Sequence, residues 1–365
     1  MGSDIADFDN DGWLDIVTVD MVAEDNYRIK TNMSGMNPKR FKNAINNGFH
    51  YQYMMNTLQK NNGNGSFSEV SQLAGISSTD WSWAPLWSDF DNDGYKDLLI
   101  TNGLRKDIRN NDYVKIKKKL LNKMNKDKEG KDLDYIKEAL DQTPVNPIKN
   151  YIYKNEGNIS FTSIREEWGL NEVSFSNGAA YADLDNDGDL DLVVNNMDSE
   201  AFLFQNMAIE NDTGRYLKVI TNGILSEDFA KIQISFNGIT KTKESKRVRG
   251  YLSAVDTPMI FGLGNATVID TVRVFWPSGK YEERYKIGPN ATLTFDELNA
   301  TDQRTINLAN ETRLNVNNQL LQFTHRENDF DDFLKEGLLP YKQSTLGPLI
   351  AKGDVNGDDK DDIFI

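Results

Sequence analysis

The sequence predicts an all-β fold of four-stranded antiparallel units, the size of β-propeller blades, with a helical insertion and a smaller β-rich module. Two repeated elements give this prediction. An Asp-rich loop recurs as DFDNDGWLDIV at 7–17, DFDNDGYKDLL at 89–99 and DLDNDGDLDLV at 183–193. A hairpin signal, an Asn/Gly turn between short apolar runs, follows at 56–76 and 150–170. One unit is therefore a strand, an Asp loop, a second strand and a hairpin.

The composition excludes several classes of function. The 365-residue chain carries a formal charge of −15, which argues against a nucleic-acid partner. It has no cysteine, so disulfides, cysteine-bound zinc and thiol catalysis are excluded. Its two histidines, His50 and His325, form no metal motif, and we interpret both as structural. No apolar run reaches the roughly 20 residues that span a bilayer, and the first residues do not resemble a signal peptide.

We expect propeller blades over residues 1–210, with insertions at 20–55 and 106–149. The first insertion shows no clear period. The second predicts two helices, because apolar residues recur every three or four positions: Tyr113, Ile116, Leu120 and Met124, then Leu133, Ile136 and Leu140. The lysines between them are interpreted as a solvated helix face.

A different pattern begins near residue 211. Strand-like runs at 216–220, 231–236 and 272–276, separated by turn residues, predict a separate β module over 211–298. Residues 299–340 are polar and are expected to form a connector. Residues 341–365 are expected to begin a further repeat, the start of a second propeller, because they contain a fourth Asp loop.

The Asp loops predict calcium sites. Carboxylates fill loop positions 1, 3, 5 and 9, position 6 is glycine, and the carbonyl of position 7 is expected to join them. Calcium prefers six to eight such oxygens, and carboxylates this close repel each other without a cation. The predicted residues are Asp7, Asp9, Asp11, Trp13 and Asp15; Asp89, Asp91, Asp93, Tyr95 and Asp97; and Asp183, Asp185, Asp187, Asp189 and Asp191.

These loops are not EF-hands, because position 12 holds no glutamate and strand-forming residues follow position 9. Magnesium is the rival ion, but a cage made only of protein oxygens favours calcium. The fourth loop departs from the pattern, with Gly357 at position 4 and Asp359 at position 6; its predicted ligands are Asp354, Asn356, Asp358 and Asp362.

Three tryptophans alternate along the strand before the second Asp loop. We expect Trp81, Trp83 and Trp87 to share one face of that strand. Exposed rings could stack on a sugar, but we interpret them as packing between blades.

At the Asp loops the sequence resembles the FG-GAP/VCBS repeat family, whose blades build integrin-α-like propellers. Residues 216–298 resemble an ASPIC/UnbV module, notably in GYLS at 250–253, FGLG at 261–264 and VRVFWPSGK at 272–280. The combination is similar to the cartilage acidic protein family and its large bacterial relatives. The resemblance implies a secreted, periplasmic or cell-surface setting and a role in ligand binding or adhesion.

We therefore expect a calcium-binding, non-enzymatic extracellular scaffold whose partner is a glycan or a protein. Two alternatives stay open. One is a carbohydrate-active enzyme, a propeller lyase or hydrolase, although the obvious carboxylates are already assigned to metal. The other is a purely structural segment of a larger multi-propeller surface protein.

Overall fold

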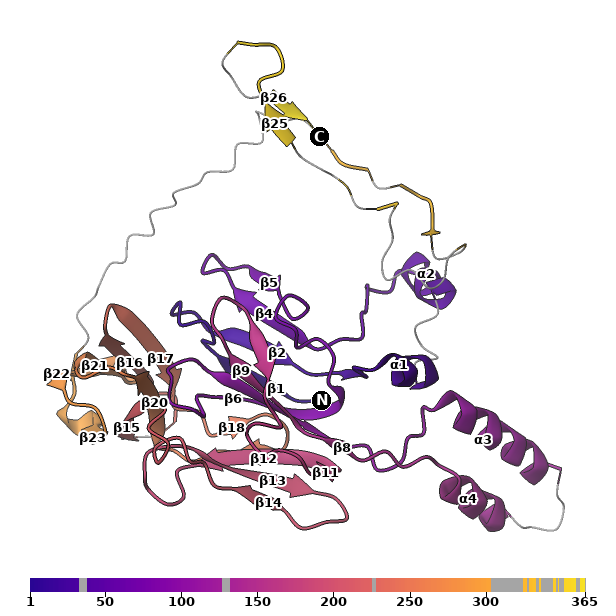
Figure 1. Cartoon of the computed structure of the whole chain (residues 1–365), viewed down its shortest axis with the longest axis horizontal. Helices are drawn as coiled ribbons and strands as arrows, with labels where there is room; N and C mark the ends of the chain where they lie inside the picture. The colour runs from indigo at the N-terminus through magenta and orange to yellow at the C-terminus, as the bar shows by residue number, and fades with distance from the viewer. Residues whose placement is uncertain are drawn as a thin grey trace. The chain divides into compact units, whose positions relative to one another are not determined.

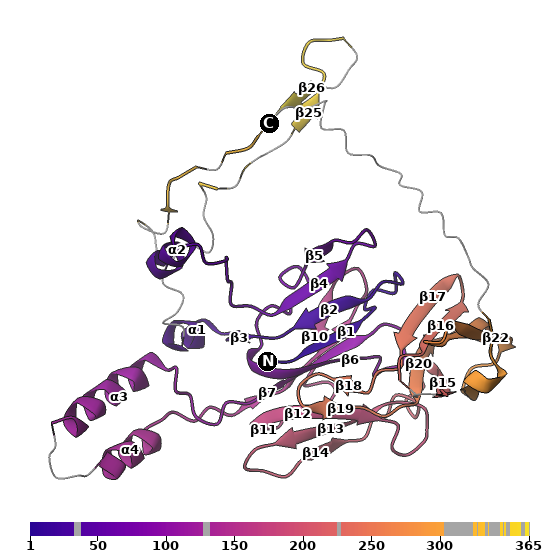
Figure 2. The same cartoon turned by 180° about the vertical axis from the view of Figure 1, so that it is seen from behind.

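The structure is a computed structural model that describes residues 1–32, 38–126, 132–224 and 228–302, and then 324–326, 328–332, 335, 344–345, 347, 351–358 and 362–364. The chain divides into two compact units. One consists of Met1–Gly35 and His50–Arg304, and the other of Met36–Phe49 and Thr305–Ile365. The first unit contains the blade sheets and the β module (Figures 1 and 2).

The blade sheets have the predicted strand order. The first runs β1-β2-β4-β5, formed by Ser3–Ala6, Asp15–Thr18, Thr57–Asn61 and Phe67–Glu69. The second runs β10-β9-β7-β6-β3, formed by Phe161–Ser163, Tyr151–Asn155, Asp97–Asn102, Asp80–Ser88 and Met21–Val22. Within the described residues the third runs β12-β13-β14, formed by Ser176–Ala182, Asp191–Asn196 and Phe202–Phe204. In each, an Asp loop joins the first two strands of the repeat, which confirms the β-propeller prediction.

The second blade contributes to two hydrophobic cores. Leu98 and Leu99 follow one another on β7 and are fully buried on opposite faces of the sheet. Leu98 packs in the core that contains Phe8, and Leu99 packs in the core that contains Leu192. This explains why β7 is hydrophobic at consecutive positions instead of alternating with polar residues.

A β-bulge makes the prediction that the tryptophans share one face of the strand wrong. Ser82 pairs with Asn102 but Pro85 pairs with Ile100, so β6 carries one extra residue between them. The extra residue reverses the alternation of side chains. Trp87 is buried in the core with Phe8, while Trp83 lies on the opposite face and contacts Tyr251 at 4.7 Å between ring centroids.

The second insertion is helical, as predicted. Helices α3 (Asn111–Met124) and α4 (Asp132–Asp141) extend away from the blade sheets (Figure 1). The Asn110 side chain caps α3 by accepting hydrogen bonds from two backbone N–H groups of its first turn. The first insertion, where no period was found, also contains helices: α1 (Asn26–Asn32) and α2 (Pro38–Asn46). No helix among the described residues has the length and apolar character needed to cross a membrane.

The β module is built from two larger sheets. One runs β20-β15-β23, formed by Met259–Gly264, Arg215–Asn222 and Ala291–Asp296. The other runs β17-β16-β21-β22-β24, formed by Ile239–Glu244, Lys231–Phe236, Ile269–Phe275, Lys280–Ile287 and Thr301–Asp302. The predicted turn at Asn237-Gly238 has positive φ at both residues, as a tight hairpin requires.

Shorter elements complete the described chain. In the first unit these are β8 (Ile148–Lys149) paired with β11 (Val173–Ser174), β18 (Val248–Arg249) paired with β19 (Ser253–Ala254), and the 3-10 helix η1 (Glu297–Asn299). In the second unit β25 (Ala351–Gly353) pairs with β26 (Asp362–Phe364). Most of the connector predicted at 299–340, and Asp359 of the fourth loop, lie outside the described residues.

Candidate metal centres

The three Asp loops of the blades share one backbone conformation. Position 4 is asparagine with φ between 57° and 64°, and position 6 is glycine with φ between 92° and 103°. Glycine adopts this left-handed region without strain, and asparagine does so more readily than most residues. Two left-handed residues reverse the chain tightly enough for the carboxylates of the loop to converge.

The convergence brings three carboxylates together in every loop. In each set the three side chains offer oxygens that all lie within 4.8 Å of one another. The sets are Asp7, Asp9 and Asp15; Asp89, Asp91 and Asp97; and Asp183, Asp185 and Asp187. All of these residues were predicted from sequence. The structure does not place Asp11, Asp93 or Asp191 in these sets, and Asp189 lies in a different one.

The aspartate at loop position 9 connects each loop to its sheet by hydrogen bonds. Asp15 pairs with Ala6 at the end of the hairpin next to the loop, and its carboxylate accepts backbone N–H bonds from Phe8 and Asn61. Asp97 and Asp191 make the equivalent pair of bonds in the second and third loops. The ninth aspartate is thus a structural acceptor as well as a candidate ligand.

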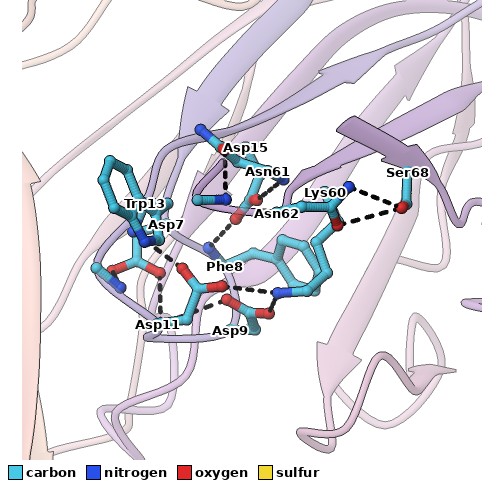
Figure 3. Close-up of polar contacts among 12 residues, drawn as sticks. Asp7, Phe8, Asp9, Asp11, Trp13, Asp15, Lys60, Asn61, Asn62 and Ser68 are labelled. Carbon is cyan, nitrogen blue, oxygen red and sulfur yellow. Dashed lines mark hydrogen bonds and ion pairs between the residues drawn. The ribbon is translucent and has the colours of Figure 1, made fainter. Parts of the chain in front are cut away.

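The aspartate at loop position 1 accepts hydrogen bonds from the backbone of the turn. In the first loop Asp7 is fully buried and accepts hydrogen bonds from the backbone N–H groups of Asp11 and Gly12, at 3.1 Å each. Asp11 in turn accepts a bond from the N–H of Trp13 at 2.9 Å (Figure 3). The side chain of Trp13 is half exposed.

Lysines that were not predicted face the loops. Lys60 on β4 donates to both Asp9 and Asp11, the latter at 2.8 Å (Figure 3). Lys154 on β9 bridges Asp91 and Asp93 in the same way. Burial lowers the pKa of Lys60, but its hydrogen bonds to Asp11 and Asp9 outweigh that effect and raise the pKa above its usual value. The ammonium group therefore neutralises part of each acidic loop.

The third loop is neutralised differently. The residue equivalent to Lys60 is Gln205, whose amide donates to Asp185 at 2.9 Å. A lysine from the β module, Lys218, instead donates to Asp183 at 2.7 Å. The repeat itself offered a signal for Lys60 and Lys154, since each precedes the asparagine of its hairpin; the role of Lys218 had no signal in the sequence.

That hairpin asparagine connects neighbouring blades. The Asn155 side chain is buried and donates to the carbonyls of Lys96, in its own blade, and Phe8, in the first blade, at 3.0 and 2.9 Å. Asn206 makes the corresponding bonds to Leu190 and Phe90. The loops also contact each other directly, because Asn10 donates to the carbonyl of Gly94. The candidate centres therefore lie along one edge of the blade array.

The second loop gives the clearest test of whether a cation fits. Asp89 is 4% exposed, and its Oδ1 is buried without a hydrogen-bond partner among the described residues. Burial raises the pKa of Asp89 to about 6, against the opposing charge of Lys241. A buried carboxylate oxygen left without a partner costs free energy that a bound cation would offset. The all-oxygen donor set suits a hard divalent cation such as calcium.

The fourth loop keeps some of the hydrogen bonds of the first loop where it is described. Gly353 pairs with Asp362, and the Asp362 carboxylate accepts the N–H of Val355 at 3.0 Å. Asp354 accepts the N–H groups of Gly357 and Asp358. Asn356 accepts a bond from the N–H of Asp358, as Asp9 does from Asp11. The loop therefore shares the bonds at positions 3 and 9 with the first loop, but Asp354 accepts from positions 4 and 5 where Asp7 accepts from positions 5 and 6, and its position 3 is an amide.

Comparisons with known families agree with this architecture. Residues 44–100 and 143–194 match the FG-GAP-like repeat, and residues 230–302 match the domain described as ASPIC and UnbV. No curated protein matches the chain. The matched repeats contain the second and third Asp loops, and the matched domain contains most of the β module. The chain is thus a nearly all-β protein of FG-GAP-like propeller repeats joined to an ASPIC and UnbV domain.

Proposed function

We propose that the protein is a non-enzymatic extracellular scaffold whose propeller loops bind calcium and whose blades bind a ligand. The partnerless, buried Oδ1 of Asp89 within a triad of carboxylates carries the calcium part of this proposal. The position 1, 3 and 9 carboxylates of the first two loops would hold the ion, with Asp183, Asp185 and Asp187 in the third. Affinities on the order of 10⁻⁴–10⁻³ M suit extracellular modules, where calcium is abundant.

Thermal unfolding tests the calcium part. At 10 mM calcium, each site of that affinity would stabilise the fold by about 1.4 to 2.7 kcal/mol, which raises the melting temperature by several degrees. Asp91→Asn should reduce this calcium-dependent rise, because it removes a ligand of the second loop. Asp141→Asn, on the exposed end of α4, is the matched control. A melting temperature that is the same with calcium and with chelator contradicts the proposal.

A groove of about 390 Å³ between the second and third blades is our candidate for the ligand surface. Trp168 and Phe204 line it beside the polar groups of Asp91, Asn206 and Asn211. A ring face next to carboxylate and amide groups suits a sugar, whose faces are apolar and whose edges carry hydroxyl groups. A glycan is therefore the partner we favour over a protein.

Glycan-array binding tests this surface. Trp168→Ala should lower binding to any glycan retained by the wild type by at least tenfold, whereas Phe67→Ala, an exposed aromatic outside the groove, should not. Equal retention by both variants would place the ligand elsewhere.

A carbohydrate-active enzyme is the second candidate, because Glu167 and Asp91 line the same groove. A purely structural role within a larger surface protein is the third. Turnover of polysaccharides, assayed as new reducing ends or unsaturated products and abolished by Glu167→Gln, would establish the enzyme. Detection of the intact protein in secreted, periplasmic and surface fractions would test the compartment.

A further inference from the structure

The third Asp loop contains an acidic side chain that the other two loops lack. Position 7 is Asp189, where the first and second loops have Trp13 and Tyr95. Asp189 is 1% exposed, and its Oδ2 accepts the backbone N–H of Ile209 at 3.1 Å. Its Oδ1 is buried and has no hydrogen-bond partner among the described residues. Burying such an oxygen costs free energy unless a cation or a hydrogen-bond donor reaches it.

Two further carboxylates lie close to that of Asp189. Asp187, Asp189 and Glu210 offer oxygens that lie within 4.8 Å of one another. Oδ1 of Asp187 accepts the N–H of Asp189, while its Oδ2 is also buried without a hydrogen-bond partner in the described part of the chain. Glu210 is exposed and lies at the open side of the cluster. Two carboxylates that each have a buried oxygen without a partner thus lie beside an accessible third carboxylate.

Among the described residues no lysine pairs with Asp187, Asp189 or Glu210, whereas Lys60 and Lys154 pair with aspartates of the first two loops. The three carboxylates therefore repel one another when no cation lies between them.

We propose that Asp187, Asp189 and Glu210 form an additional divalent-cation site, separate from the loop site of Asp183 and Asp185 but sharing Asp187 with it. The three ligands are carboxylates, which favour calcium, and the exposure of Glu210 leaves room for water to complete the coordination shell. The choice of calcium rests on the function proposed for the loops.

The site would fix the junction between the last blade and the β module. Glu210 lies in the segment between β14 and β15 that connects the two. In the same segment, Thr213 donates to the carbonyl of Asp91 at 2.9 Å, and Met207 and Asn211 line the groove between the blades. A cation held by Glu210 would therefore immobilise one wall of that groove.

Isothermal titration of the full chain with calcium chloride tests the site by counting bound ions. Glu210→Gln should bind one ion fewer than the wild type and should fold normally, because the side chain is exposed. Glu156→Gln, at an exposed turn residue of the second blade, is the matched control and should bind the wild-type number. Asp185→Asn should remove the loop site of the third blade and leave the Glu210-dependent ion in place.

The outcomes separate this site from the loop sites. If Glu210→Gln binds as many ions as the wild type while Asp185→Asn binds fewer, the additional site is refuted and the loop sites stand. If the wild type binds no calcium, both the additional site and the calcium function of the loops are refuted. Terbium-soaked crystals would give a second readout, an anomalous peak beside Asp189 that is lost in Glu210→Gln.

Discussion

At the scale of single residues, each Asp loop combines candidate ligands with groups that compete for them. Asp9 and Asp11 both contact Lys60, and a calcium ion that draws them inward must displace its ammonium group. The loops therefore contain their own counter-charge. If the loops bind calcium, such lysines should therefore lower the affinity.

Lys60→Met should tighten calcium binding at the first loop by about fivefold, since a partly exposed ion pair is worth up to about 1 kcal/mol. Lys154→Met should do the same at the second loop. Calcium titration measures both, with Lys118→Met on the exposed face of α3 as the control. Weaker binding in the two loop variants would show that the lysines support the sites.

Calcium dependence should vary with pH. Burial raises the pKa of Asp15 from 3.8 to about 7, so the metal-free native state binds its proton more tightly than the unfolded chain does. Ionising such a group costs stability, so the metal-free protein should become less stable as pH rises from about 4 to about 7. Calcium should offset that loss, and its affinity should rise over the same range.

Urea unfolding at pH 5 and pH 8, each in metal-free buffer and with calcium, measures this effect. Stability gained from calcium should be larger at pH 8. An equal gain at both pH values would contradict the assignment of these carboxylates as ligands.

At the scale of elements, Asn155 and Asn206 each join two neighbouring blades by hydrogen bonds. Asn155 → Ala would leave the carbonyls of Phe8 and Lys96 buried without their donors. We expect a loss of about 2 kcal/mol in the free energy of unfolding, measured with urea. Asn61→Ala, which removes a bond to Leu14 within one blade, should cost about half as much. Equal losses would mean that contacts between blades add nothing.

The elements also show where sequence reasoning was limited. The strand order followed from the repeat, because an Asp loop and an Asn/Gly turn each specify a hairpin. The orientation of Trp83 did not follow, because the bulge beside Pro85 reverses the alternation and leaves no separate mark in the sequence. Helix α1 was missed because none of its residues is buried, so it has no apolar period.

At the scale of the whole first unit, the β module packs closely against the second Asp loop. A Cβ at Gly262 on β20 would lie 2.1 Å from an Asp89 carboxylate oxygen. Gly264 also donates its N–H to the carbonyl of Asn92 at 2.9 Å. The module therefore seals the second loop, which explains why Asp89 is more buried than Asp183.

Gly262→Ala should separate the module from the second loop and destabilise the fold by about 1–3 kcal/mol, as overpacking of a tight contact does. Thermal unfolding in calcium measures the loss. Gly288→Ala is the control, because a Cβ there would meet nothing within 4 Å. A wild-type melting temperature for Gly262→Ala would show that the module does not depend on this contact.

The sequence by itself determined the blade repeat, the helical hairpin, the β module and the carboxylates that converge in the loops. These follow from local rules: turn residues, side-chain periodicity and the spacing of acidic groups along a few residues of chain. Only the tertiary structure decided that Lys218 neutralises the third loop, that the module buries Asp89, and that Glu210 meets Asp189. Those contacts join residues 21 to more than 150 positions apart, so their geometry depends on how blades and module pack rather than on any local pattern.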